Sequence, residues 1–223
     1  MKALIGSTGV VGTALQSQIA IDQFFNRATI ETMNGHYELV ICAAPSGSRI
    51  LVNADSAADQ QAIVQIQTQL KKCNINKLIL ISTVDACCYY NFPYGFNRKN
   101  FETWCKQNYS NFHVIRLGSL IGANITKNIL YDLRHQTWLD KINFDSRLQW
   151  TCLNDLGTAI DYAITHNLSE INLISEPIEN RQIIERWAPE LKSTASSVPQ
   201  HYDIKPYWYS KQKIFDAMEK YFQ

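Results

Sequence analysis

The chain has 223 residues, 46% of them hydrophobic, and its 21 Lys and Arg residues nearly balance its 20 Asp and Glu residues. A chain of this length can bury one sizeable core, so we expect a single domain over 1–223 whose last part, roughly 125–223, contributes a small C-terminal lobe. The balanced charge argues against a nucleic-acid partner, and the apolar runs are too short to cross a bilayer, so no membrane association is expected.

The cysteines and the amino-terminal residues point to a reducing compartment. The sequence starts with a strand pattern and a glycine turn rather than with a secretory signal, and its six cysteines contain no CxxC pair. We therefore expect free thiols and a cytoplasmic protein. No His and Cys spacing is typical of a zinc site, so we predict no metal.

Short apolar runs alternate with helical patterns along the first half of the chain. Strands are predicted over 2–5, 23–25, 39–44, 77–82 and 113–117, and helices over 10–20, 55–72 and 97–107. Residues 28–37 fit a loop or a helical turn. Since strands that alternate with helices indicate βαβ units, the predicted fold class is α/β, a Rossmann-type doubly wound parallel sheet.

The second half has a mixed pattern that suits a lobe. Apolar spacing predicts a helix over 154–166, a short strand over 170–174 and a terminal helix over 211–222 that begins after Ser210. A polar segment over 192–200 contains a proline and is expected to be a loop.

A glycine-rich turn joins the first strand to the first helix. Gly6, Gly9 and Gly12 follow a GxxGxxG spacing, in which the first glycine allows the turn, the second a close approach of phosphate and the third a close helix. Because a helix start offers free amide groups to an anion, this segment predicts a dinucleotide site. The residues expected to bind the cofactor are Gly6, Ser7, Thr8, Gly9, Val10, Val11 and Gly12.

The end of the second strand bears on the choice between NAD and NADP. An acid about 20 residues beyond the first glycine would bind the free ribose hydroxyls, but that place holds Asn26 and then Arg27, and the nearest acid is Glu31. Arg27 can pair with a 2′-phosphate, which favours NADP(H) over NAD(H); a solvated surface arginine is the alternative interpretation.

Five motifs in chain order resemble the extended short-chain dehydrogenase/reductase family, also called the NAD-dependent epimerase/dehydratase family. The first is the GSTGVVG turn. The second, VICAAP, resembles a strand that lines the cofactor, and the third, LILISTVDA, resembles a strand that ends in a Ser/Thr pair. The fourth is the YGxSKxxxE-like run from Tyr94 through Arg98 to Glu102, and the fifth is the segment around Asn154-Asp155. The resemblance spans about 160 residues and is carried by the order of the motifs.

The resemblance implies hydride transfer between a nicotinamide and a carbon that bears oxygen. Tyr94 would be the acid/base on the substrate oxygen and Thr83 the hydroxyl that orients it, with Ser82 as a substitute. The cofactor would also contact Ala43, Ala44, Pro45 and Ser82. The substrate would be a small hydroxyl or carbonyl compound, for which the family suggests a nucleotide sugar.

The sequence departs from the family at the residue that assists the tyrosine. Arg98 occupies the position of a lysine that lowers the phenol pKa, and Lys99 lies about 100° further round the helix. Arginine can still lower that pKa by proximity, but its planar group is not a neutral replacement. We therefore keep two hypotheses: an oxidoreductase or epimerase in which Arg98 stabilises the phenolate, and a non-catalytic dinucleotide-binding sensor or accessory protein. A homodimer through 97–107 is suggested by family analogy alone.

Overall fold

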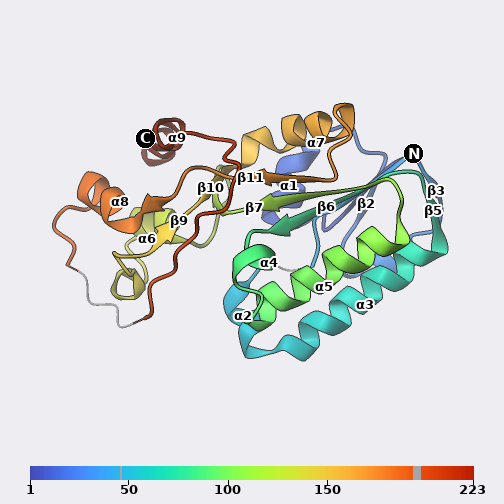
Figure 1. Cartoon of the computed structure of the whole chain (residues 1–223), viewed down its shortest axis with the longest axis horizontal. Helices are drawn as coiled ribbons and strands as arrows, with labels where there is room; N and C mark the ends of the chain where they lie inside the picture. The colour runs from blue at the N-terminus through green and yellow to red at the C-terminus, as the bar shows by residue number, and fades with distance from the viewer. Residues whose placement is uncertain (46, 193–196) are drawn as a thin grey trace. The chain divides into compact units, whose positions relative to one another are not determined.

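The computed structural model describes residues 1–45, 47–192 and 197–223 (Figure 1). Residues 193–196 of the predicted loop over 192–200 lie outside this description. The chain folds into two compact units: the first comprises Met1–Arg116 and Asn154–Ile171, and the second comprises Leu117–Leu153 and Asn172–Gln223. Residues 154–171, which fall in the range predicted for the lobe, thus belong to the first unit.

The first unit is built around a six-stranded sheet with the strand order β11-β7-β6-β4-β1-β2. At its centre β1 pairs in parallel with β2 and β4, and β4 pairs in parallel with β6. This crossover order confirms the predicted α/β, Rossmann-type parallel sheet. The strands are β1 (Lys2–Ile5), β2 (Gln23–Phe25), β4 (Leu39–Cys42), β6 (Leu78–Thr83), β7 (Phe112–Leu117) and β11 (Glu170–Leu173).

Helices cover both faces of this sheet (Figure 1). The long α3 and α5 lie side by side on one face, and α1 and α7 contact each other on the other. The helices of the first unit are α1 (Val10–Gln16), α2 (Arg49–Ala54), α3 (Ser56–Lys72), α4 (Asp85–Cys88), α5 (Pro93–Asn108) and α7 (Leu156–Thr165).

Two helices differ from their predicted bounds, and both differences matter for the site. A separate helix, α2, precedes the helix predicted from residue 55, because Asp55 ends α2 and caps α3 by accepting a bond from the Ala58 amide. The helix predicted over 97–107 already begins at Pro93, since proline suits the first position of a helix. Tyr94 therefore lies in the first turn of α5.

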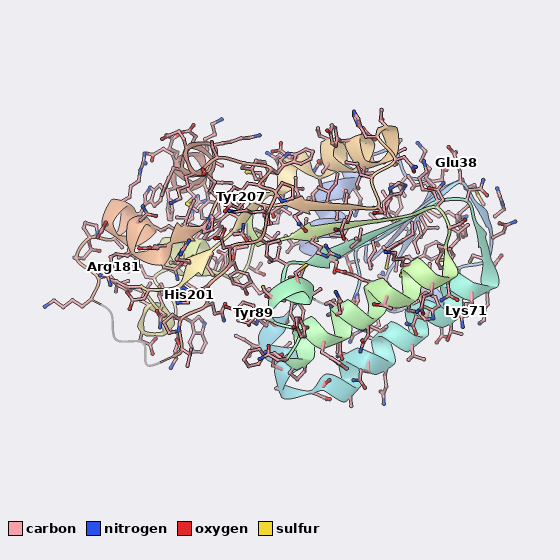
Figure 2. All side chains as sticks on the ribbon, in the orientation of Figure 1. Glu38, Lys71, Tyr89, Arg181, His201 and Tyr207 are labelled. Carbon is pink, nitrogen blue, oxygen red and sulfur yellow. The ribbon has the colours of Figure 1, made fainter. Side chains whose placement is uncertain are left out.

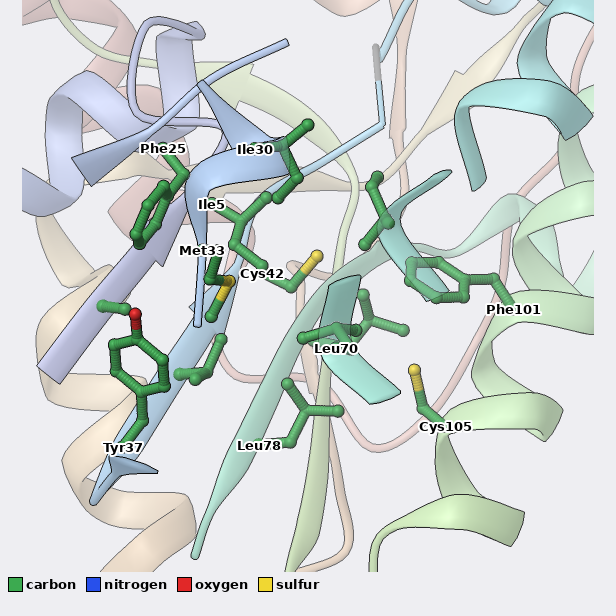
Figure 3. Packing of buried hydrophobic residues seen from close by; sticks show 14 of the residues in the cluster. Ile5, Phe25, Ile30, Met33, Tyr37, Cys42, Leu70, Leu78, Phe101 and Cys105 are labelled. Carbon is green, nitrogen blue, oxygen red and sulfur yellow. The ribbon is translucent and has the colours of Figure 1, made fainter. Parts of the chain in front are cut away.

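The segment over 28–37 contains both a helical turn and a strand. The turn η1 spans Ile30–Thr32, and β3 (Gly35–Tyr37) pairs in parallel with β5 (Cys73–Ile75). Their side chains close the edge of a core between the sheet and the α3–α5 pair, shown in Figure 3. The fully buried residues of that core include Tyr37, Val40, Leu70 and Leu78.

The second unit is built from short elements. Its strands form two pairs, β8 (Ser119–Ile121) with β10 (Trp150–Cys152) and β9 (Arg147–Leu148) with β12 (Ile178–Glu179). Its helices are α6 (Ile129–His135), the turn η2 (Leu139–Lys141), α8 (Asn180–Trp187) and α9 (Lys211–Phe222), while the turn η3 (Leu153–Asp155) spans the boundary between the units. Ser210 caps α9 as predicted.

Charged side chains of the second unit are mostly exposed. Arg181 of α8, labelled in Figure 2, pairs with Asp145 at 2.7 Å on the surface. Within the described ranges of the whole chain, no helix is both long and apolar enough to cross a membrane. All six cysteines are free thiols, as predicted.

Candidate functional site

Two of the three glycines in the first turn are required by packing. Gly6 has φ +84°, and a Cβ placed on it would lie 2.5 Å from the carbonyl oxygen of Ala43. A Cβ on Gly12 would clash with the carbonyl oxygen of Gly6. These glycines let the end of β1 turn beside β4 and let α1 pack close to that turn, in the roles expected from their spacing.

Gly9 is different, because nothing in the described part of the protein requires a glycine there. Its φ is −78°, which any residue adopts, and the nearest atom to an added Cβ is the Gly6 carbonyl oxygen at 3.5 Å, an ordinary contact. Gly9 also begins α1 without any side-chain cap, and the first turn of that helix holds no acid. The missing side chain and the uncapped helix start suit an anion that approaches the amides of Val10 and Val11.

Ser7 and Thr8 complete the turn in different ways. The Ser7 hydroxyl is buried and donates to the carbonyl oxygen of Phe25 at 3.2 Å, which ties the turn to the end of β2. Thr8 is exposed at the tip of the turn. Ser7 therefore holds the turn in place, whereas the Thr8 side chain is open to a ligand.

Ala43, Ala44 and Pro45 follow β4 and lie beside the glycine turn. The Ala43 amide donates to the carbonyl oxygen of Ile5 at 2.8 Å, and the Ala44 side chain is among the atoms closest to an added Cβ on Gly6. All three residues are half-buried. They border the space that the family resemblance assigns to the cofactor.

At the end of β2 the predicted ribose-binding residues have separate surroundings. The Asn26 side chain accepts bonds from the amides of Ala28 at 2.8 Å and Thr29 at 3.2 Å, so it serves its own turn. Arg27 is exposed and forms no ion pair with any described residue. Glu31 accepts a bond from Gln65 at 3.0 Å. Among these side chains, the Arg27 guanidinium is the one available to an incoming phosphate.

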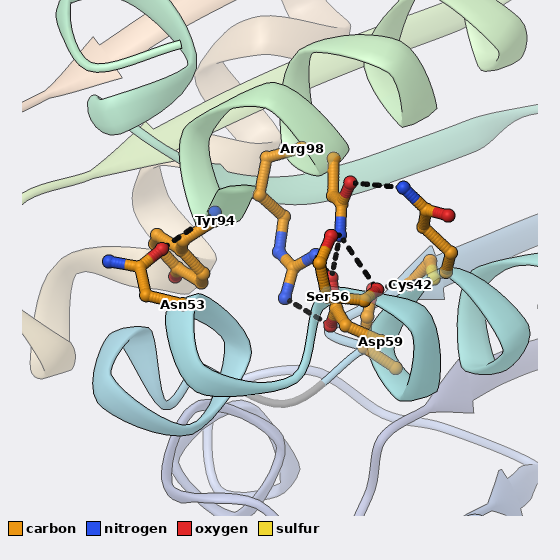
Figure 4. A network of polar contacts seen from close by, with 9 residues as sticks. Cys42, Asn53, Ser56, Asp59, Tyr94 and Arg98 are labelled. Atoms are coloured by element: carbon orange, nitrogen blue, oxygen red, sulfur yellow. Dashed lines mark hydrogen bonds and ion pairs between the residues drawn. The ribbon is translucent and has the colours of Figure 1, made fainter. Parts of the chain in front are cut away.

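Thr83 and Tyr94 are brought together although ten residues separate them. Thr83 is the last residue of β6, and its side chain hydrogen-bonds to the Tyr94 side chain. The Tyr94 amide donates to the Asn53 side chain of α2 at 2.9 Å (Figure 4), which fixes the start of α5. The strand end and the helix start thus place two hydroxyls in contact at the carboxyl edge of the sheet, where open α/β sheets bind ligands.

Arg98 lies against Tyr94, but its charge is already paired. Its carbon Cζ is 4.7 Å from the Tyr94 ring centroid, and its terminal nitrogens contact the two carboxylate oxygens of Asp59 at 2.8 and 2.9 Å (Figure 4). Both side chains are buried. Lys99 is exposed, so Arg98 is the cation of α5 beside the phenol.

The Tyr94 phenol resists ionisation in these surroundings. Its pKa is raised above the ordinary value of 10.0, chiefly because burial penalises the charged form, and Asp85 and Asp59 raise it further. Arg98 and the Thr83 hydrogen bond act in the opposite direction.

Ser82 faces a different partner from its neighbour Thr83. Its hydroxyl donates to the buried carboxylate of Glu102 at 2.5 Å, and Glu102 binds Arg116 through two nitrogens. Ser82 is therefore used within the interior. The contacts favour Thr83 as the partner of Tyr94.

Sequence reasoning missed Asp59 and Asn53. Asp59 lies 39 residues before Arg98, and Asn53 lies in α2, a helix that the sequence patterns did not predict. No local pattern links either residue to α5. The break at Asp55 and the proline at 93 were signals that could have placed the helix ends.

The second unit has its own cavity, of about 260 Å³. Its lining includes Asn180, which is buried and whose side-chain oxygen has no hydrogen-bond partner among the described residues, and Trp138, which is 68% exposed. An acceptor without a partner and an exposed ring are features of a small-ligand site. No cluster of metal-binding side chains occurs in the described ranges.

The fold is that of the NAD-dependent epimerase/dehydratase enzymes, as the motifs predicted. One solved structure with this fold is a UDP-glucose 4-epimerase from Thermus thermophilus in complex with NAD, with TM-score 0.69, 14% identity, and coverage of 100% of this chain and 94% of that one. Another is a dTDP-glucose 4,6-dehydratase double mutant from Streptomyces venezuelae with NAD and DAU bound, with TM-score 0.71, 9% identity and coverage of 100% and 91%.

A third is RMD from Pseudomonas aeruginosa in complex with NADPH, with TM-score 0.67, 15% identity and coverage of 98% and 92%. At the level of sequence, no family model and no curated protein matches the chain. These likenesses establish the fold.

Proposed function

We propose that the first unit binds a nicotinamide dinucleotide and that the protein is an NAD(P)-dependent oxidoreductase or epimerase/dehydratase. The observation that carries this proposal is Gly9. Packing explains Gly6 and Gly12, whereas a Cβ on Gly9, at an uncapped helix start, would meet no more than an ordinary contact. Close approach of a pyrophosphate would explain a glycine there.

The residues around the turn fit such a cofactor. The amides of Val10 and Val11 would receive the pyrophosphate, with Thr8 at the tip and Ala43 to Pro45 alongside. The exposed Arg27 would pair with a 2′-phosphate, which favours NADP(H) over NAD(H). When bound, the dinucleotide supplies the hydride chemistry.

The chain's own contribution to the reaction is proton handling. Tyr94 would exchange its phenolic proton with the substrate oxygen, and the Thr83 hydroxyl, already bonded to Tyr94, would orient that oxygen. The substrate is a small hydroxyl or carbonyl compound. Two of the structures with this fold are sugar-nucleotide enzymes by their names, which makes a nucleotide sugar the first substrate to try.

The alternative, a dinucleotide-binding sensor or accessory protein without turnover, is favoured by one observation. Both terminal nitrogens of Arg98 are bound by Asp59, which offsets part of the charge that would otherwise stabilise a phenolate. This alternative shares the cofactor site and lacks only the chemistry.

Binding is tested with Gly9→Ala, which adds a methyl group where the protein leaves room. We expect an unchanged unfolding midpoint and at least a tenfold weaker affinity for NADPH by calorimetry, about 1.4 kcal/mol. Ser17→Ala, at the opposite end of α1, is the matched control and should bind as wild type does. Equal affinity in Gly9→Ala would refute the turn as the cofactor site.

Turnover is tested with Tyr94→Phe in the presence of NADPH and a panel of keto nucleotide sugars, whose carbonyl group can accept the hydride. Because an epimerase or dehydratase returns the hydride and leaves no net change in the cofactor, ordinary nucleotide sugars are tested alongside by product analysis. We expect oxidation of NADPH, seen at the nicotinamide absorbance band, to be lost while cofactor affinity stays within about twofold of wild type. Equal turnover would exclude Tyr94 as the acid. Binding without turnover by wild type on any compound of the panel would favour the sensor.

A further inference from the structure

Among the described residues, the donors that hold the carboxylate of Asp59 come from α5 alone. Two are the terminal nitrogens of Arg98, and the third is the side-chain amide of Asn97 at 2.8 Å. The Asn97 oxygen in turn accepts a bond from Gln60 at 3.2 Å. The Asp59 side chain is only 4% exposed and that of Arg98 6%. Such a carboxylate is fixed in place beside its cation.

A second buried ion pair on α5 provides a comparison. Glu102 binds Arg116 at 2.8 Å and receives the Ser82 hydroxyl, but neither charge is among the groups that act on Tyr94. Arg116 also reaches the exposed Glu170 at 3.1 Å. Two ion pairs of similar burial thus share α5, and of these two only the pair of Asp59 with Arg98 places its cation against the Tyr94 ring.

We propose that Asp59 is a positioning residue of the site: it holds the Arg98 guanidinium by both terminal nitrogens against the face of the Tyr94 ring, offsets its charge there, and so keeps Tyr94 as a proton donor to a carbonyl oxygen. This inference rests on the proposed function for its chemical consequence. Its structural part, the control of Tyr94 ionisation by Asp59, stands without a cofactor.

The charges that face Tyr94 come from three helices. Arg98 belongs to α5, Asp85 to α4 and Asp59 to α3, and Asp85 is itself paired with Arg49 of α2 at 3.4 Å. Each cation therefore has a carboxylate beside it. With the charges offset in pairs, burial of the ring governs its ionisation and the phenol keeps its proton, in line with its raised pKa.

A protonated phenol suits reduction. In the reduction of a carbonyl group, a bound dinucleotide would supply the hydride. The carbonyl oxygen would then take the phenolic proton, so that the O–H bond of Tyr94 breaks as a new O–H bond forms on the substrate. The tyrosinate then takes a proton from solvent. Because the reaction starts from the neutral phenol, its rate in this direction falls only where Tyr94 ionises.

The test follows the titration of Tyr94 in protein labelled with ¹³Cζ-tyrosine, with Tyr94→Phe to assign the signal. In wild type we expect the Tyr94 signal to stay in its protonated position over the pH range in which exposed tyrosines titrate. In Asp59→Asn the carboxylate charge is lost and Arg98 acts on the phenol unopposed, so the signal should titrate at lower pH than in wild type.

Two further variants separate positioning from a structural role. Glu102→Gln removes the carboxylate of the other buried pair and should leave the Tyr94 titration unchanged; a downward shift equal to that of Asp59→Asn would overturn the proposal. Arg98→Lys, which keeps Asp59 and is expected to fold even if Asp59→Asn does not, should also leave it unchanged because Asp59 holds the ammonium. A clear downward shift in Arg98→Lys would equally overturn it.

The dependence of kcat on pH gives a second measurement. For carbonyl reduction, kcat of Asp59→Asn should decline with rising pH earlier than kcat of wild type, since the proton donor is lost at lower pH. If Tyr94 shifts as expected but no reduction is found with any substrate, the positioning role stands and the proposed function fails.

Discussion

The glycine turn and the start of α5 are both built at strand ends of the same sheet, yet they depart from the family pattern to different degrees. In the turn, Gly6 and Gly12 are required by close backbone contacts and Gly9 leaves room for a ligand. At α5 the tyrosine and its hydroxyl partner are in contact, but the cation beside them is bound by Asp59. The proposed function thus assigns binding and catalysis to separate residues, and each can be altered alone.

The largest effect should come from Asp59→Ala. Removing this carboxylate leaves Arg98 buried without its partner, which typically costs about 3–5 kcal/mol of the free energy of unfolding. Urea denaturation of the variant and of wild type measures this loss. A loss below about 1 kcal/mol would mean that water reaches the pair and that α5 is not held by it.

Gly12→Ala should have the next largest effect, a loss of about 1–3 kcal/mol in the free energy of unfolding. The added methyl group clashes with the Gly6 backbone rather than with a side chain that can move. Thermal unfolding compares it with Gly9→Ala, which should unfold as wild type does. Equal destabilisation of the two variants would contradict the separate roles given to these glycines.

Arg27→Ala should affect binding without affecting the fold. Loss of a charge-assisted bond to a 2′-phosphate should weaken NADPH about tenfold, roughly 1.4 kcal/mol, and leave NADH affinity unchanged. Calorimetry with both coenzymes checks this. A parallel loss for both would mean that Arg27 does not contact the 2′-phosphate.

The smallest effect on stability is expected outside both regions, at the start of α9. Ser210 caps α9 by accepting a hydrogen bond from the Lys213 amide, so Ser210→Ala should lower the free energy of unfolding by about 1 kcal/mol. Its NADPH affinity should equal that of wild type. A change in affinity would show that the second unit influences the cofactor site, which would blur the comparison.

The sequence predicts what local patterns encode. It predicts β2 at its observed bounds, and it correctly locates the glycine turn and Thr83 at the end of β6. The pair of Asp59 with Arg98 could not be predicted, because its members come from two helices 39 residues apart and meet only when those helices pack. The short strands of the second unit, such as β9 and β12 with two residues each, lack enough alternation to be recognised.

The most direct test of the account is calorimetry of the wild-type protein with NADPH and with NADH. We expect saturable binding of a dinucleotide, tighter for NADPH, since α1 starts without a side-chain cap and Arg27 is exposed. Absence of binding heat with both coenzymes across several temperatures would contradict it.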